Sequence, residues 1–169
     1  MATPSGSLVS SVLREYGDAT RGILFDYLPK TEPRRYLYDL VADYPRRGGR
    51  GFRPSLCIAT ARAFGAPVEA ALRTAVSIEL LHNAMLIHDD IEDESEQRRG
   101  KPTLHVAEGV PIAINVGDML SVLSMRPLLD NQRLLGAPRS LRILEETERM
   151  ARESAEGQAL ELGWRRDNV

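Results

Sequence analysis

The stretch ELLHNAMLIHDDIED, residues 79–93, carries an apolar helix straight into a cluster of carboxylates. Side chains four and seven residues apart share one face of an α-helix, so His82, Asp89 and Asp93 line a single stripe, with Asp90 beside it. Carboxylates at the carboxyl end of a helix oppose its macrodipole, at a cost of about 0.3–1 kcal/mol for each position. Repulsion between neighbouring aspartates adds to that cost, so the cluster calls for a cation to offset it.

Outside this helix, apolar residues again recur at helical spacing and no segment alternates in the manner of a strand, which predicts an all-α fold. Glycine and proline gather at the proposed boundaries, and Pro127 should kink or shorten the helix that contains it. Residues 1–7 are expected to form a flexible tail and residues 94–110 a polar loop. The expected helices cover residues 8–28, 33–44, 54–65, 67–93, 111–130 and 138–164.

The bulk composition excludes several classes of protein. The chain has 169 residues, of which 43% are hydrophobic and 27% charged, as expected for one soluble domain. A formal net charge of -2 provides no broad basic surface for nucleic acid. The single cysteine, Cys57, cannot form an internal disulfide and indicates a reducing compartment. No charged leader and no uninterrupted apolar run of about 18 residues stands out, which predicts a cytoplasmic protein without a transmembrane segment.

A magnesium ion would offset the acidic cluster, because Mg²⁺ accepts one or two carboxylates and completes its octahedron with water and phosphate oxygens. Arg98 and Arg99 would then grip phosphate oxygens through charge-assisted hydrogen bonds. A second basic element, GGRGFRPS at residues 48–55, places Arg50 and Arg53 on a glycine-rich turn that enters a helix, which is a natural anion cradle. Two alternatives stay open. The acidic run is also compatible with a solvated helix end, and the glycines with a flexible connection that leaves the arginines unexplained.

The order of several motifs resembles that of the trans-isoprenyl diphosphate synthase family, also called polyprenyl synthetases, and the wording is most similar to geranylgeranyl diphosphate synthases. The resemblance implies an isoprenoid synthase helical bundle around a deep cavity. Because the family's second aspartate-rich motif does not appear, residues 8–169 are expected to form the amino-terminal part of one such domain, as a fragment of a longer synthase. The motifs are GGRGFRP, IELLHNAMLIHDDIEDES, RRGKPTLH, GVPIAINVGDML and EGQALELGWRRDN.

The resemblance also implies site residues, a cofactor and partners. It implies Mg²⁺, isopentenyl diphosphate and an allylic prenyl diphosphate as substrates, and a homodimer. Two positions depart from the family's pattern: Glu161 stands where the family often has aspartate, and Arg50 and Gly51 replace the family's usual lysine and arginine. The implied metal ligands are Asp89, Asp90, Asp93 and Glu161. The implied diphosphate contacts are Arg98 for the allylic substrate and Arg50, Arg53, His82 and Arg99 for isopentenyl diphosphate, with Gln158 near the reacting allyl group.

The function implied is chain elongation. Metal and arginines stabilise the departing diphosphate while the alkene of isopentenyl diphosphate attacks the allylic cation. Ala84 and Met85, small and flexible, favour a geranylgeranyl or longer product, although plain core packing explains them equally well. Two alternatives are a noncatalytic subunit of a full-length synthase and a class I terpene cyclase. Outside the site, we expect His88 to pair with a carboxylate, His105 to hydrogen-bond in a loop, and Trp164 to be a core or interface residue.

Overall fold

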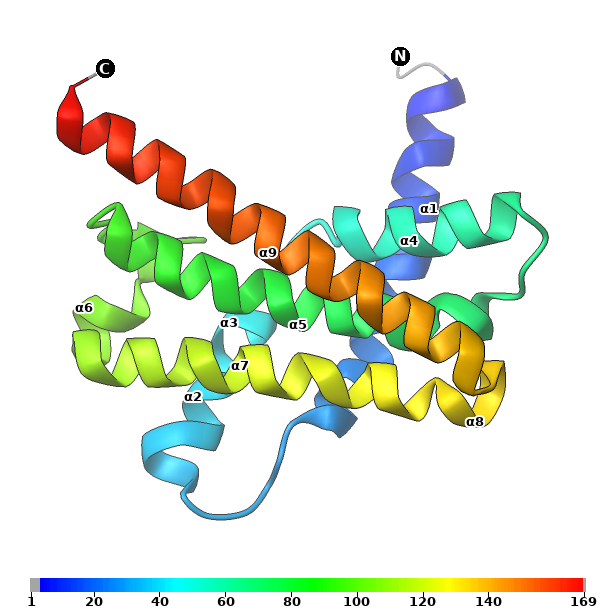
Figure 1. The fold of residues 1–169 in the computed structure, drawn as a ribbon, viewed down its shortest axis with the longest axis horizontal. Helices are drawn as coiled ribbons and strands as arrows, with labels where there is room; N and C mark the ends of the chain where they lie inside the picture. The colour runs from blue at the N-terminus through cyan, green and yellow to red at the C-terminus, as the bar shows by residue number, and fades with distance from the viewer. Residues whose placement is uncertain (1–3, 169) are drawn as a thin grey trace.

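The computed structural model describes residues 4–168, with side chains from residue 8 onward, and it confirms the all-α class (Figure 1). The long helices are α1 (Pro4–Leu24), α4 (Phe52–Ala63), α5 (Val68–Glu92), α7 (Val110–Asp130) and α9 (Ala137–Asp167). The short helical elements are η1 (Phe25–Tyr27), η2 (Arg34–Tyr38), α2 (Asp39–Val41), α3 (Asp43–Arg46), α6 (Leu104–Glu108) and α8 (Gln132–Leu135), and one hairpin joins β1 (Gln97–Arg98) to β2 (Lys101–Pro102).

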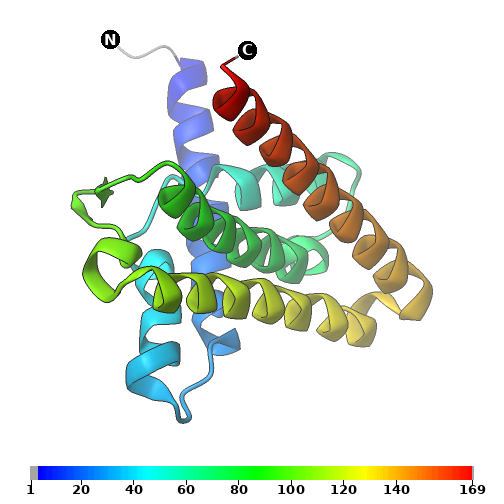
Figure 2. The ribbon, with the colours of Figure 1, turned by 60° about the vertical axis from the view of Figure 1, so that its left-hand side comes forward.

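Helix α5 is the centre of the bundle. It lies antiparallel beside α7, its most extensive neighbour, and also packs against α4 and α1 (Figures 1 and 2). The buried apolar face of α5 consists of Val76, Leu80, Ala84 and Ile87, each 1% exposed or less. These side chains lie in one core cluster whose other buried members are Leu24, Leu28, Leu37, Val41, Ala42, Tyr44, Leu104, Ala113, Val116 and Leu120.

Most of the predicted helices are confirmed to within a few residues, and the exceptions are local. The segment predicted as one helix over 33–44 is instead a π-helical turn followed by the short helices α2 and α3. The predicted polar loop contains the β1–β2 hairpin and α6. Helix α7 continues through Pro127 to Asp130, so this proline does not shorten it. The tail predicted for residues 1–7 lies partly outside the described residues, since α1 begins at Pro4.

Helices α7 and α9 leave large apolar side chains in contact with solvent. Helix α9 in particular is little covered, since Ser140 is its one buried residue. Trp164 is 56% exposed, so it is not a core residue of the described chain, contrary to one half of its prediction. Apolar faces of this extent are typical of surfaces that other protein segments cover. The exposed residues are Val110, Ile114, Val122, Met125 and Leu129 of α7 and Leu141, Met150, Leu160 and Trp164 of α9.

By length and composition alone, one segment of the described chain, Val110–Leu135, is able to cross a membrane, with a mean hydropathy of 1.3. This segment includes α7, and 39% of its apolar 18-residue window is buried inside the bundle. Core helices of soluble proteins meet the same criterion, so the segment carries little weight as evidence for a membrane protein.

The fold gathers the predicted site at one end of the bundle. The carboxyl end of α5, the hairpin, α6, the start of α7 and the end of α9 all lie on the left in Figure 1. The glycine-rich turn between α3 and α4 lies nearer the middle of α5, and α3 itself packs against α5. Segments that are far apart in the sequence therefore meet around one helix end.

Candidate active site

A cavity with a volume of ≈ 740 Å³ opens beside the middle of α5. This volume is in the range of small-molecule sites, about 300–1,000 Å³. Four guanidinium groups line it against a single carboxylate, that of Glu79, so its charge favours an anion. The lining residues are Leu13, Arg47, Gly49, Arg50, Gly51, Phe52, Arg53, Glu79, His82 and Arg99. The structure thus brings together all four residues for which the sequence predicted a shared diphosphate contact: Arg50, Arg53, His82 and Arg99.

The glycine-rich turn shapes the rim of this cavity. Gly48 and Gly51 have φ angles of +73° and +60°, a backbone conformation that favours glycine because it has no Cβ. Gly51 also lies against α1, where a Cβ would come within 3.1 Å of the Cα of Gly17. The turn ends at the amino terminus of α4, so the positive end of the α4 dipole adds to the arginine charge.

His82 is a neutral acceptor inside the cationic cavity. Burial, and then the charges of Arg53, Arg99 and Arg98, lower its pKa to about 4. Nη1 of Arg53 lies 3.4 Å from Nε2 of His82. Because a guanidinium only donates hydrogen bonds, Nε2 accepts and the imidazole proton is on Nδ1.

Arg99 reaches the cavity from the hairpin. Its Nη1 donates to the backbone carbonyl of Tyr44 at 3.4 Å. The guanidinium also lies against the glycine turn, where a Cβ on Gly49 would stand 2.9 Å from Nη2. Burial of the guanidinium is the main cause of a lowered pKa for Arg99, but an arginine stays charged in proteins. The hairpin therefore delivers a partly desolvated cation for an anionic ligand.

The aspartate stripe lies further along α5. Asp89 is 38% exposed and Asp93 35% exposed, so both carboxylates are accessible. Burial, followed by the charge of Asp93, raises the pKa of Asp89, and Arg98 compensates only in part. A raised carboxyl pKa means that the negative charge is held at a cost, which an added cation would relieve. Asp89 and Asp93 are hard oxygen donors of the kind that Mg²⁺ takes, and this fits a magnesium site formed by two carboxylates.

Asp90 does not fit its predicted role as a metal ligand. Its side chain is fully buried, at 0% exposure. One carboxylate oxygen, Oδ1, accepts a hydrogen bond from Nε of Arg98 at 2.7 Å and lies 2.6 Å from Nη2 in an ion pair, and the other accepts a hydrogen bond from the hydroxyl of Tyr44. With both oxygens occupied and no route to solvent, Asp90 is a buried anchor for Arg98. Arg98 also reaches Asp89, 3.3 Å from its Oδ2, and so links the stripe to the core.

The carboxyl end of α9 faces this stripe through an arginine. Arg165 donates to Asp93 at 2.5 Å and to Glu161 at 2.7 Å. Gln158 donates to Glu92 at 2.8 Å. Among residues 4–168 no group of three or more His, Cys, Asp or Glu side chains is arranged to hold a metal ion, and the metal role of Glu161 stays a prediction.

The structure also describes the surroundings of two further histidines, His88 and His105. His88 does pair with a carboxylate, Oδ1 of Asp118 at 3.4 Å, although that partner is on α7. Nδ1 of His105 is buried with no partner among the described residues, so the predicted hydrogen bond is not seen at that atom.

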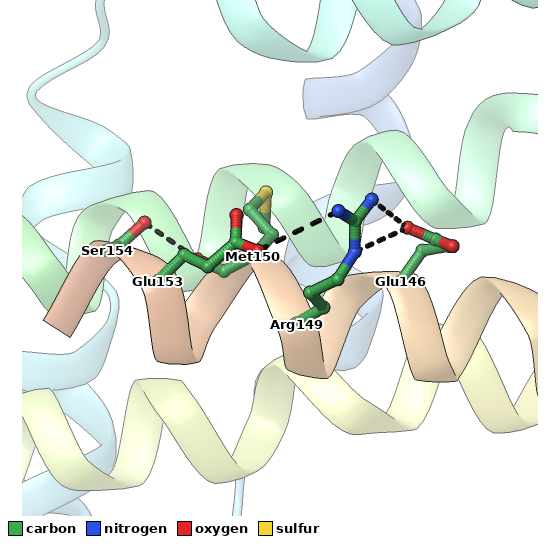
Figure 3. A pocket seen from close by; sticks show the side chains of 5 residues that line it. All are labelled: Glu146, Arg149, Met150, Glu153 and Ser154. Atoms are coloured by element: carbon green, nitrogen blue, oxygen red, sulfur yellow. Dashed lines mark hydrogen bonds and ion pairs between the residues drawn. The ribbon is translucent and has the colours of Figure 1, made fainter. Parts of the chain in front are cut away.

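A second hollow, of ≈ 430 Å³, lies along α9 alone (Figure 3). Its charged side chains are paired within the helix, because Arg149 contacts both Glu146 and Glu153. This solvated face agrees with the i,i+3 and i,i+4 pairing expected along a charged helix and presents no site.

Sequence reasoning missed two residues at the site, Tyr44 and Arg47. Tyr44 is 1% exposed and contacts both the stripe and the hairpin. Arg47 lines the cavity while its guanidinium lies 4.5 Å above the ring of Tyr44 and pairs with Asp43 at 2.6 Å. The doubled arginine of PRRGGRG was the available signal for Arg47. No local pattern marked Tyr44, whose role depends on contacts 46 and 60 residues away in the sequence.

The described residues form an all-α bundle with a cationic cavity beside an aspartate stripe. Residues 34–169 match the polyprenyl synthetase family, and the chain belongs to that family. It is 32% identical over 165 residues to geranylgeranyl pyrophosphate synthase of Geoglobus acetivorans, covering 96% of this chain and 50% of the relative.

Solved structures show the same likeness. The geranylgeranyl pyrophosphate synthetase of Pyrococcus horikoshii Ot3 superposes with a TM-score of 0.86 at 32% identity, covering 96% of this chain and 49% of that one. The polyprenyl synthase of Caulobacter crescentus CB15, in complex with calcium and isoprenyl diphosphate, superposes with a TM-score of 0.77 at 27% identity, covering 90% and 45%. The chain therefore spans about half the length of the relatives that it matches.

Proposed function

We propose that this chain forms the diphosphate-binding part of a magnesium-dependent trans-prenyltransferase, which elongates an allylic prenyl diphosphate with isopentenyl diphosphate. The observation that carries the proposal is the pairing of two different anion sites on one helix. His82 faces the arginine cavity, and Asp89 follows seven residues later, which is roughly 10 Å along an α-helix. That spacing suits two substrates whose diphosphate groups lie side by side.

The two sites would bind diphosphate in different ways, because their charges are opposite. The cavity binds a diphosphate directly, through Arg50, Arg53 and Arg99, and needs no metal. The stripe is anionic and binds a diphosphate only through a cation, which Asp89 and Asp93 would hold. When bound there, magnesium would supply Lewis-acid stabilisation of the departing diphosphate.

The residues of the chain then serve the leaving group and the docked phosphate. Arg98 lies beside Asp89 and stabilises the negative charge that develops as the allylic C–O bond breaks. The alkene of isopentenyl diphosphate attacks the allylic carbon, a C–C bond forms and a proton is lost. No side chain acts as a nucleophile. Gln158 is proposed only to contact the allyl group.

The same proposal includes the product length, the metal and the assembly of the protein. The product is geranylgeranyl diphosphate or longer, because Ala84 and Met85 present no large ring before the aspartate stripe. The calcium and isoprenyl diphosphate bound by the relative from Caulobacter crescentus support both the metal and the substrate class. We further propose a cytoplasmic homodimer, supported by the apolar outer faces of α7 and α9, with no nucleic acid among its partners.

An elongation assay tests this function. The full-length gene product is incubated with Mg²⁺, isopentenyl diphosphate and a labelled allylic diphosphate, and prenyl products are separated by length. Products longer by multiples of five carbons support the proposal, and Asp89→Ala with Asp93→Ala should abolish them. Diphosphate release from the allylic substrate alone would instead indicate a terpene cyclase. Product formation only after addition of a second synthase chain would indicate a noncatalytic subunit.

A further inference from the structure

Tyr44 lies at the junction of the two proposed diphosphate sites. Its ring is buried in the core, and its hydroxyl donates to Oδ2 of Asp90. The same hydroxyl accepts a hydrogen bond from the backbone N–H of Leu104 at 3.4 Å, immediately after the hairpin. The backbone carbonyl of Tyr44 accepts a hydrogen bond from Arg99. One residue of α3 thus contacts the helix, the hairpin and one of the two hairpin arginines.

Through Asp90, the hydroxyl is also linked to Arg98, the other arginine of the hairpin. Because Tyr44 occupies one carboxylate oxygen, only the second is presented to Arg98, which approaches it with both Nε and Nη2. Arg98 therefore bridges the two aspartates, with Nε bonded to Asp90 and Nη2 to Oδ2 of Asp89 at 3.3 Å. In this position the Arg98 side chain is 26% exposed.

Arg47 reinforces the same junction. Its guanidinium lies over the Tyr44 ring and donates to the backbone carbonyl of Arg98 at 3.2 Å. Asp43 holds Arg47 in turn, and the Arg47 side chain is only 5% exposed. The backbone of the hairpin is therefore fixed from α3 at Arg98, while the Arg98 side chain is fixed by Asp90.

We propose that Tyr44 is a positioning residue for the reaction, whose hydroxyl orients Arg98 toward the allylic diphosphate by fixing the Asp90 carboxylate. The inference rests on the proposed function and extends it to a residue that contacts no substrate itself. The hydroxyl and the carbonyl of Tyr44 act on different arginines, so the two contributions are separable. Replacing tyrosine by phenylalanine removes the hydroxyl and keeps the carbonyl that holds Arg99.

The test compares Tyr44→Phe with the wild-type full-length gene product in steady-state elongation assays, varying each substrate in turn. We expect kcat/KM for the allylic diphosphate to fall about 10- to 100-fold, the equivalent of one lost buried hydrogen-bond partner. The KM for isopentenyl diphosphate should stay within about twofold, because a backbone contact holds Arg99 in the variant. A merely structural role would weaken both substrates together. Tyr38→Phe is the matched control, since Tyr38 packs against the same core and its hydroxyl has no hydrogen bond among the described residues.

A double-mutant cycle shows whether Tyr44 acts through Arg98. In an Arg98→Lys background, Tyr44→Phe should cost less than about threefold, because the interaction that it supports is already lost. Equal losses in both backgrounds, or a loss shared by both substrates, would overturn the inference. If Tyr44→Phe is unfolded at the assay temperature, the same comparison is made for all variants at a lower temperature, at which circular dichroism shows them folded. An inactive wild-type protein overturns the proposed function itself, whereas an active wild type with a Tyr44→Phe variant that behaves like Tyr38→Phe overturns only the role of Tyr44.

Discussion

Gly49 offers a way to displace one cavity arginine without changing its charge. An alanine Cβ at this position would stand 2.9 Å from Nη2 and 3.1 Å from Cζ of Arg99, both closer than ordinary van der Waals contact of 3.4 Å or more. The guanidinium is the far end of a flexible side chain, so it moves instead of the backbone. Gly49→Ala should therefore leave folding nearly unchanged while shifting Arg99 out of the cavity.

The size of the effect follows from the interaction that is lost. A hydrogen bond to a charged group contributes about 1.5–3 kcal/mol, which corresponds to roughly a 10- to 150-fold weaker Kd. The assay is isothermal titration of the metal-free protein with inorganic pyrophosphate, which isolates the cavity from the aspartate stripe. Thermal unfolding of the same samples monitors stability.

Two glycine variants serve as controls for Gly49→Ala. Gly22→Ala, in α1 with nothing within 4 Å of the added Cβ, should bind pyrophosphate as the wild type does. Gly48→Ala also has open space, but its φ of +73° strains an alanine, so it should lose stability without crowding Arg99. If Gly49→Ala keeps wild-type affinity while Arg99→Ala loses it, the assignment of Gly49 as the residue that makes room for Arg99 is wrong.

Three further results are expected. The pKa of His82 is about 4 in the folded chain and about 6.5 when unfolded, so the unfolded state binds more protons between these values. The contribution of neutral His82 to the free energy of unfolding is therefore complete above pH 6.5 and falls by roughly 1–2 kcal/mol toward pH 4, after reduction for partial solvent exposure. Urea unfolding curves measure this pH dependence, which His82→Gln should lose. Asp90→Asn should cost about 3 kcal/mol by breaking a buried ion pair, whereas Asp89→Asn should not destabilise; equal losses in thermal melts would contradict the separate roles of the two aspartates. Arg165→Ala frees Asp93 and should tighten Mn²⁺ binding several-fold, measured by electron paramagnetic resonance of the free ion, with Arg166→Ala as the control; unchanged binding would show that Arg165 does not compete with the metal.

The apolar residues exposed on α7 allow a direct physical test. Val122, Met125 and Leu129 lie three and four residues apart on one face of this helix, each more than half exposed, and such a face favours association because each buried Å² of apolar area contributes about 25 cal/mol. This is the face on which the proposed dimer, or further parts of a synthase, would pack. Light scattering of the full-length gene product reports the association directly.

The sequence alone determined the helix at residues 79–93, its side-chain stripe and the family. Helical periodicity is a local property, so the relative placement of His82, Asp89 and Asp93 on α5 followed from spacing without any tertiary contact. The same holds for the glycine-rich turn, whose residues mark a backbone conformation by themselves. The motifs also placed Arg50, Arg53 and Arg99 in one group, and the cavity confirms that they meet.

Tertiary structure decided which aspartate faces solvent and which is buried. Asp89 and Asp90 are neighbours in the same motif, but successive residues of a helix differ by about 100° in direction, and only packing determines which direction is covered. Tyr44 and Arg98 cover Asp90, across 46 and 8 residues of sequence. No local pattern encodes such contacts, because they depend on how α3 and the hairpin settle against α5. That is the physical reason why the sequence did not distinguish the buried Asp90 from its exposed neighbour Asp89, and why Tyr44 went unnoticed.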